Sequence, residues 1–290
     1  MYDQILLPVD EQTENAEVLH HAGEIAHRFD AEIRLVHVAD TDEYSVALTD
    51  QGVVDGLVRR GEELVAEAGE TFETLGVEYS TDVVQGSPAA TIVEYASEYD
   101  YDLLVMPTHG REGLSHFLLG SVTEKVVRLS SVPVLTARMT EEDTFAFPYE
   151  RILLPTDTSD ASRRAAEHGL DLAAAMDAAV DVLSVVETAA LGPDVQSSMT
   201  TGDFDQGARE AVSNVAAMAE KRGVEATTHV ETGSPDEEIL SAIDDQDCQA
   251  VVMGTTGRRG VDRILLGSVA EKTVRSAPVP VVTVRSEQEE

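Results

Sequence analysis

Glycines and arginines gather near the end of the chain, in the stretch MGTTGRRGVDRILLGSV from Met253 to Val269. Glycine lets the backbone approach another group closely, and the amides of a glycine-rich turn can bind an anion. Gly267 and Ser268 are typical of a helix start, where the first amides and the helix dipole also favour negative charge. The stretch therefore predicts a phosphate site. The alternative is a tight strand-to-helix connection in which the glycines only serve turns.

Other reactive side chains form weaker groups. Asp10 and Asp157 each follow an apolar run, where a carboxylate can bind a ribose, cap the next helix or act in catalysis, and we favour binding or capping. His109 and His116 have no histidine counterparts in the duplicate described below, which argues against a metal site. The GxxxxGK[ST] and GxGxxG motifs are absent, and matched positions offer no Ser-His-Asp or Cys-His group. We therefore expect neither catalytic residues nor a dedicated hydrolase or transferase.

The segments that position these residues occur twice in the chain. The recurring pairs are ILLPVD and ILLPTD (5–10 and 152–157), GSP (86–88 and 233–235), and LLGSVTEKVVR and LLGSVAEKTVR (118–128 and 265–275). Each pair is separated by 147 residues (157 − 10 and 233 − 86), which indicates duplication of a whole domain. We expect one domain at residues 1–138, a polar linker at 139–148 and a second domain at 149–290.

Each copy alternates apolar runs with helix-like segments. In the first copy we expect strands at 4–9, 32–38, 77–84, 102–107 and 132–137, and helices at 13–29, 56–75, 88–98 and 121–128. Such alternation predicts an α/β fold with a parallel, doubly wound sheet, whose ligands bind beyond the carboxyl ends of the strands. In the second copy these ends carry Asp157, Val185 and the loop from Met253.

Charge is the strongest feature of the composition. The 290 residues carry a formal net charge of −35, and Lys125, Lys221 and Lys272 are the only lysines. Such a surface repels nucleic acid and anionic membranes, so neither is an expected partner. The acidic excess favours a halophilic protein of a high-salt cytoplasm, with an unusually acidic mesophilic protein as the alternative.

The remaining features point to an ordinary cytoplasmic location. We find no apolar run of membrane-spanning length and no leader pattern at the N-terminus. Cys248 is the only cysteine, which excludes an internal disulfide, and we expect it to be a buried structural thiol. His20, His21 and His27 follow one expected helix, and we interpret them as solvated or boundary residues.

The pattern Gly254-x₂-Gly257-x₉-Gly267-Ser268 resembles the motif of ATP-binding universal stress proteins. ILLPTD, GSP, VVMGTTG, LLGSV and VPVVTV stand in the family's order, so the resemblance covers nearly the whole chain twice. It implies two tandem Rossmann-like domains, each with a five-stranded parallel sheet (adenine nucleotide alpha hydrolase-like). It also implies a stress-response factor that binds ATP or AMP, with or without Mg²⁺, with at most slow ATP hydrolysis or autophosphorylation.

The resemblance implies a nucleotide site in each copy. In the second copy the residues at the adenosine end are Pro155, Thr156, Asp157 and Val185, and those around ribose and phosphates are Met253, Gly254, Thr255, Thr256, Gly257, Arg258, Gly260, Gly267, Ser268, Val269 and Ala270. The first-copy counterparts are Pro8, Val9, Asp10 and Val38, then Met106, Pro107, Thr108, His109, Gly110, Arg111, Gly113, Gly120, Ser121, Val122 and Thr123. Pro107 stands where the first glycine belongs and has no N–H to donate, so we expect a weaker first site.

The resemblance further implies that the domains pair through their last strands, in SVPVLTAR and APVPVVTVR, and it allows a homodimer. Two other functions stay open. The chain could be a non-catalytic dimerisation or interaction module with degenerate nucleotide sites. An adenylate-transferring enzyme of the wider superfamily would need catalytic motifs that the sequence lacks.

Overall fold

The computed structural model divides into two compact units, Met1–Phe145 and Ala146–Glu290. It describes residues 1–11, 13, 17–40, 51–108, 119–138, 145–187, 201–257 and 266–286, without the side chains of 51–54 and 201–205. The two units have the same order of elements. In the described part of the chain, no helix is both long enough and apolar enough to cross a membrane.

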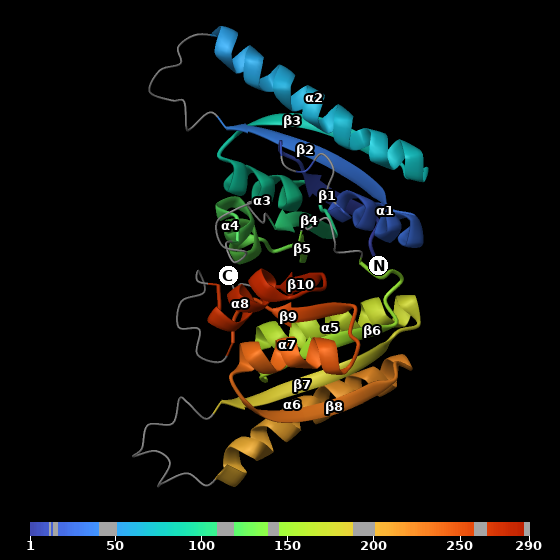
Figure 1. The fold of residues 1–290 in the computed structure, drawn as a ribbon, viewed down its shortest axis with the longest axis vertical. Helices are drawn as coiled ribbons and strands as arrows, with labels where there is room; N and C mark the ends of the chain where they lie inside the picture. Colours follow the sequence, from blue (N-terminus) through green and yellow to red (C-terminus); the bar gives the residue numbers. More distant parts are fainter. Residues whose placement is uncertain are drawn as a thin grey trace. The chain divides into compact units, whose positions relative to one another are not determined.

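The first unit is a five-stranded parallel sheet with helices on both faces (Figure 1). Its elements are β1 (Gln4–Pro8), α1 (Glu17–Phe29), β2 (Glu32–Asp40), α2 (Gln51–Leu75), β3 (Tyr79–Gly86), α3 (Pro88–Glu98), β4 (Leu103–Thr108), α4 (Ser121–Leu129) and β5 (Val134–Arg138). The strand order is β3-β2-β1-β4-β5. Helix α1 contacts α2, and α3 contacts α4, so the helices form two layers around the sheet.

The second unit repeats this arrangement. Its elements are β6 (Arg151–Pro155), α5 (Asp160–Met176), β7 (Ala179–Glu187), α6 (Thr201–Arg222), β8 (Ala226–Gly233), α7 (Pro235–Asp245), β9 (Ala250–Gly254), α8 (Ser268–Ser276) and β10 (Val281–Val284). The strand order is β10-β9-β6-β7-β8, again with parallel neighbours. Helices α5 and α6 contact each other, as do α7 and α8. The α/β fold with doubly wound sheets is therefore confirmed.

The apolar runs predicted the strands because a parallel sheet covered on both faces buries nearly every side chain. In β4 and β9 all residues except Gly254 are buried. Helix α3 begins at Pro88 as expected, since proline suits the first turn of a helix. Strand β2 runs two residues past the expected end at Val38, because it stays paired with β3 up to Asp40 and Gly86.

Histidine 21 contradicts its expected surface position. Its side chain is only 1% exposed, and its ring lies 5.2 Å from that of Phe145, between centroids. Desolvation by burial lowers the pKa of His21, although neighbouring Glu24 acts in the opposite direction. The expected linker at 139–148 thus contributes Phe145 to the first unit, while residues 139–144 lie outside the described residues.

Candidate functional site

The carboxyl end of β6 leads into a tight polar turn before α5. The carboxylate Oδ1 of Asp157 accepts hydrogen bonds from the Ser159 N–H at 3.0 Å and the Ser159 hydroxyl at 2.5 Å. The same hydroxyl oxygen accepts the Ser162 N–H at 3.2 Å, which caps the start of α5. Asp157 therefore lies at the strand end with its position fixed by the helix cap, which agrees with the binding-or-capping hypothesis.

The loop after β9 packs directly on this turn. A Cβ added to Gly257 would lie 2.7 Å from Asp157 Oδ2, and one added to Gly254 would lie 2.7 Å from the backbone carbon of Ala161. The Ser159 hydroxyl also lies 3.3 Å from the carbonyl oxygen of Thr256. The structure thus brings together the predicted residues Asp157, Gly254, Thr256 and Gly257.

The start of α8 closes the other side of this loop. The Gly267 N–H donates to the Thr255 carbonyl at 2.8 Å, which places the helix start beside the end of β9. Gly267 is the N-cap residue, and among the described residues no side chain caps the helix, unlike α5. Helix amides without such a cap retain capacity for an anionic ligand.

A buried hydroxyl adds to this capacity. Thr255 is 2% exposed, and its Oγ1 has no hydrogen-bond partner among the described residues. A buried polar atom without a partner is unusual and often marks a water or ligand contact. In the first unit the matching hydroxyl of Thr108 instead donates to the Ala137 carbonyl at 2.9 Å. The residues around α8 therefore fit a phosphate-bearing ligand.

The first unit builds the matching region differently. Asp10 is held by Thr13, three residues on: the Thr13 hydroxyl donates to Asp10 Oδ1 at 2.7 Å and accepts the Asp10 N–H at 3.1 Å. The Pro107 carbonyl accepts the hydroxyl of Thr123 from α4 at 3.0 Å. Helix α4 resembles α8, with Gly120 as N-cap and no side-chain cap in the described part of the chain.

The remaining predicted residues divide into placed ones and ones that cannot be placed. Six predicted residues of the two loops lie outside the described residues: His109, Gly110, Arg111, Gly113, Arg258 and Gly260. Val38 and Val185 do not follow their strands as expected but lie two residues before the ends of β2 and β7. Met106 and Pro107 belong to β4 itself, and Met253 and Gly254 to β9. The first turn of α4 contains Ser121 and Val122, and that of α8 contains Ser268, Val269 and Ala270. Strand β1 ends at Pro8 and is followed by Val9, and β6 ends at Pro155 and is followed by Thr156.

Comparison with known proteins identifies the two units. The profile of the Universal stress protein family matches residues 1–138 and again 148–285. The chain belongs to the universal stress protein family. Its two matches make it a tandem member, as the duplicated motifs predicted.

Individual relatives agree with this assignment. Universal stress protein MJ0531 of Methanocaldococcus jannaschii is 37% identical over 145 residues, which are 49% of this chain and 85% of that protein. The crystal structure of a universal stress protein from Archaeoglobus fulgidus has a TM-score of 0.76 and 24% identity, and the match covers 98% of both chains. A second structure, of a universal stress protein in complex with cAMP, is 24% identical, and the match covers 48% of this chain and 98% of that chain, with a TM-score of 0.36.

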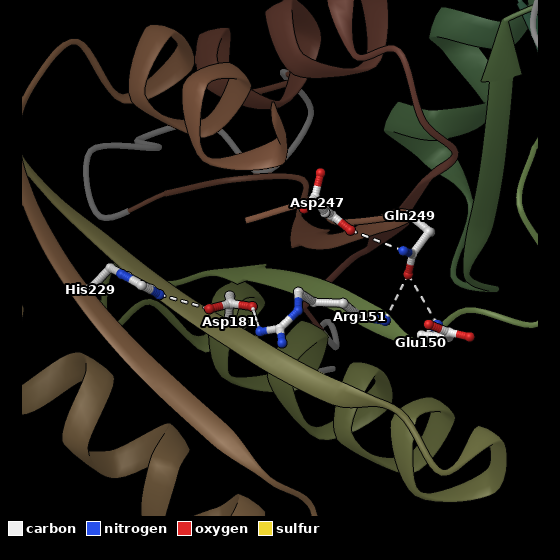
Figure 2. Close-up of polar contacts among 6 residues, drawn as sticks. All are labelled: Glu150, Arg151, Asp181, His229, Asp247 and Gln249. Carbon is white, nitrogen blue, oxygen red and sulfur yellow. Dashed lines mark hydrogen bonds and ion pairs between the residues drawn. The ribbon is translucent and has the colours of Figure 1, made fainter. Parts of the chain in front are cut away.

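The second unit of this universal stress protein also contains a buried polar cluster that the sequence analysis did not predict. Asp181, on β7, is 0% exposed and lies between the Arg151 guanidinium and the His229 ring, each 2.7 Å from one carboxylate oxygen (Figure 2). Next to it, the Gln249 side-chain oxygen accepts the N–H groups of Glu150 and Arg151, at 3.0 and 2.7 Å. The sequence feature that could have indicated this cluster is the aspartate inside the otherwise apolar segment AVDVLSVV.

The cysteine lies beside this cluster. Cys248 is 4% exposed, and desolvation by burial together with the nearby charge of Asp181 raises the pKa of its thiol to about 12. A thiol with such a pKa stays protonated at neutral pH and is a poor nucleophile. The expectation of a buried structural thiol is confirmed.

Proposed function

We propose that this tandem universal stress protein binds ATP or AMP at the carboxyl edge of the second sheet and acts as a nucleotide-responsive stress factor. The observation that carries the proposal is the start of α8, where helix amides without a side-chain cap adjoin the unpartnered hydroxyl of Thr255. A helix N-terminus of this kind favours phosphate through its amides and its dipole.

The two ends of the site have different chemistry. Asp157 lies two residues after β6 and Val185 two residues before the end of β7, and a carboxylate acceptor and an apolar side chain there suit a nucleoside. Ser268, Val269 and Ala270 supply the first amides of α8 and suit phosphate oxygens. Bound Mg²⁺ would neutralise phosphate charge in this acidic protein; the described residues contain no group of three metal-ligating side chains, so its ligands would come mainly from phosphate and water.

We propose that the first site is weaker than the second. Pro107 cannot donate the amide that a glycine would offer, and Thr108 already uses its hydroxyl within the sheet. One lost hydrogen bond to a charged phosphate corresponds to about ten- to a hundredfold in affinity. The first site is then empty at low ATP or selective for a nucleotide with fewer phosphates.

A carboxylate placed at the start of each helix tests this assignment without damaging the fold. Ser268→Asp adds negative charge at the N-terminus of α8, which favours the helix but repels phosphate. We expect the variant to keep its melting temperature and to lose the tight ATP site, by about a hundredfold or more in affinity. The matched variant Ser121→Asp, at the start of α4, leaves the tight site in place. Calorimetric titration with ATP measures both.

The outcomes separate the candidate functions. Loss of the tight site in Ser121→Asp but not in Ser268→Asp would reverse the assignment of the two units. If the unmodified protein takes up neither ATP nor AMP at millimolar concentration, the alternative of an interaction module with degenerate sites is favoured. The break at Pro107 is the observation that keeps this alternative open for the first unit.

Three further properties are part of the proposal. The first is that the units pair through β5 and β10 and allow a homodimer. The second is that the protein works in the cytoplasm. The third is that its net charge of −35 adapts it to high salt. Self-repulsion of this charge is screened within about 3 Å at 1 M salt, so the melting temperature should rise with KCl. A melting temperature that does not change with KCl would argue for the acidic mesophilic alternative.

A further inference from the structure

Gly254, the last residue of β9, and Gly257, three residues further on, pack against the turn that contains Asp157. We propose that Gly254 and Gly257 are positioning residues: they keep space clear for the turn that fixes Asp157, and so act at the nucleoside end of the site. The proposal rests on the proposed function only in that Asp157 contacts the nucleoside. The packing of the turn itself is a property of the described residues.

Gly257 acts directly. A Cβ at this position would lie 2.7 Å from Asp157 Oδ2, a distance at which one of the two groups must move. The other oxygen, Oδ1, is held by both the N–H and the hydroxyl of Ser159. Any side chain at position 257 would therefore turn the carboxylate or pull it out of its bonds with Ser159.

Gly254 acts through the first turn of α5. A Cβ here would lie 2.7 Å from the backbone carbon of Ala161 and 2.8 Å from the backbone nitrogen of Ser162. A helix backbone cannot move aside as the end of a flexible side chain can. The N–H of Ser162 donates to the hydroxyl oxygen of Ser159, which also donates to Asp157. A shift of this helix turn therefore reaches Asp157 through one serine.

The first unit supports this interpretation by contrast. Its residue at the position of Gly254 is Pro107, whose side chain would occupy the space that Gly254 leaves clear. There the hydroxyl of Thr13, which occupies the position of Asp160, holds Asp10. Proline in the motif is thus accompanied by a different support for the aspartate, as expected if the glycine serves that support.

The first experiment needs no nucleotide. Gly254→Ala and Gly257→Ala are compared with Gly169→Ala as a matched control. Gly169 lies on α5, ten residues after Ser159, and its new Cβ would lie 2.4 Å from Leu154 Cδ2. Amide hydrogen exchange is followed by NMR at Ser159 and Ser162. We expect exchange at both amides to be about tenfold faster in the first two variants, because local strain loosens the turn, and unchanged in the control.

The second experiment measures the affinity for ATP and for AMP by calorimetry. An effect through Asp157 predicts the same loss, about tenfold, for both nucleotides in each glycine variant. In an Asp157→Ala background, Gly257→Ala should then cost less than about twofold, since the two changes share one contact.

The results distinguish failure of this proposal from failure of the proposed function. Unchanged exchange at Ser159 and Ser162 overturns the positioning role, whatever binds. A loss that is much larger for ATP than for AMP, and persists without Asp157, shows that the glycines act on phosphate. Faster exchange in a protein that takes up neither nucleotide supports the packing of the turn and removes nucleotide binding.

Discussion

The second strand of each unit carries a charged residue at the same place, but the sign differs. In the first unit β2 presents Arg34, which is hydrogen-bonded to Tyr101, and in the second unit β7 presents Asp181 between Arg151 and His229. The positions that contribute Arg151 and His229 carry Gln4 and Asp82 in the first unit, and Cys248 replaces Tyr101.

The comparison teaches that the fold requires complementary neighbours here and not a particular charge. Removing a charge from water is unfavourable unless partners satisfy it, so a change of sign on β2 or β7 must be accompanied by changes on adjacent strands. A second exchange of partners occurs one residue after Tyr101 and Cys248, at Asp102 and Gln249. Asp102 Oδ2 accepts the N–H groups of Asp3 and Gln4, and in the second unit the side-chain oxygen of Gln249 has this role.

The largest effect is expected from removing Asp181 from the buried polar cluster of the second unit. Asp181→Leu leaves Arg151 and His229 without their shared partner and should lower the free energy of unfolding of the second unit by about 3 kcal/mol. The matched Arg34→Leu should cost only about 1 kcal/mol, because the Nε of Arg34 is already buried without a partner among the described residues. Urea-dependent hydrogen exchange with mass spectrometry measures each unit separately. Equal losses in the two variants would contradict the comparison.

A smaller effect concerns a histidine that the two units share. His168 matches His21, and desolvation by burial lowers the pKa of His168 to about 4, against the opposing charge of Asp171. Below pH 6.5 the unfolded chain binds a proton at this position while the folded unit does not. Folding of the second unit should therefore lose up to about 3 kcal/mol between pH 6.5 and pH 4.

The variant His168→Gln tests this pH dependence. It should flatten the fall in stability over that range and leave stability above pH 7 nearly unchanged apart from packing. His21→Gln, in the first unit, should change the pH dependence in the same direction, because the pKa of His21 is also lowered. Urea unfolding at a series of pH values gives both curves. Parallel curves for His168→Gln and the unmodified protein would exclude the effect.

The smallest effect lies at the starts of α3 and α7. Asp236 accepts hydrogen bonds from Ser234 at 2.8 Å and from Lys272 at 3.0 Å, whereas the first unit has Ala89 with the matching Ser87 and Lys125. Partial burial alone would raise the pKa of Asp236, but these bonds outweigh it and lower the pKa. Its stabilising effect is thus present at neutral pH and is lost as the pH falls below the ordinary aspartate range.

Exchanging these residues sharpens the comparison. Asp236→Ala should cost the second unit about 0.5 kcal/mol, because a carboxylate favours a helix N-terminus. Ala89→Asp should not bring the first unit the same gain, because Ala89 is only 6% exposed and burial of the new carboxylate opposes it. Lys272 is 54% exposed, so the cost of Asp236→Ala should shrink in high salt. Thermal melts of both variants at low and high KCl measure this, and an equal gain in Ala89→Asp would contradict the role of burial at this position.

The sequence predicted the elements because their signals are local. Apolar runs marked the strands, and Pro88 marked the start of α3, which runs to Glu98 as expected. The partners of Asp181 were not predictable in this way. His229 pairs with Leu183, two residues along from Asp181, so their contact depends on the register of β7 and β8. Likewise, the motif indicated Gly254 and Gly257 but not that both pack on the turn of Asp157, which requires α5 in place.

The opposite charges on β2 and β7 have a consequence for how a chain with two similar domains folds. Tandem copies of one fold can exchange equivalent strands and form misassembled states. Docking β3 in place of β8 would bring Asp82 to Asp181, two carboxylates in a buried position, and the reverse exchange would bring His229 to Arg34. Because the residues around Arg34 and Asp181 differ, exchanged strands would meet unfavourable neighbours. His229→Asp would place an aspartate against Asp181 in the correctly assembled second unit too. The correct and the exchanged arrangements would then be similarly unfavourable, and the sequence would no longer distinguish β8 from β3.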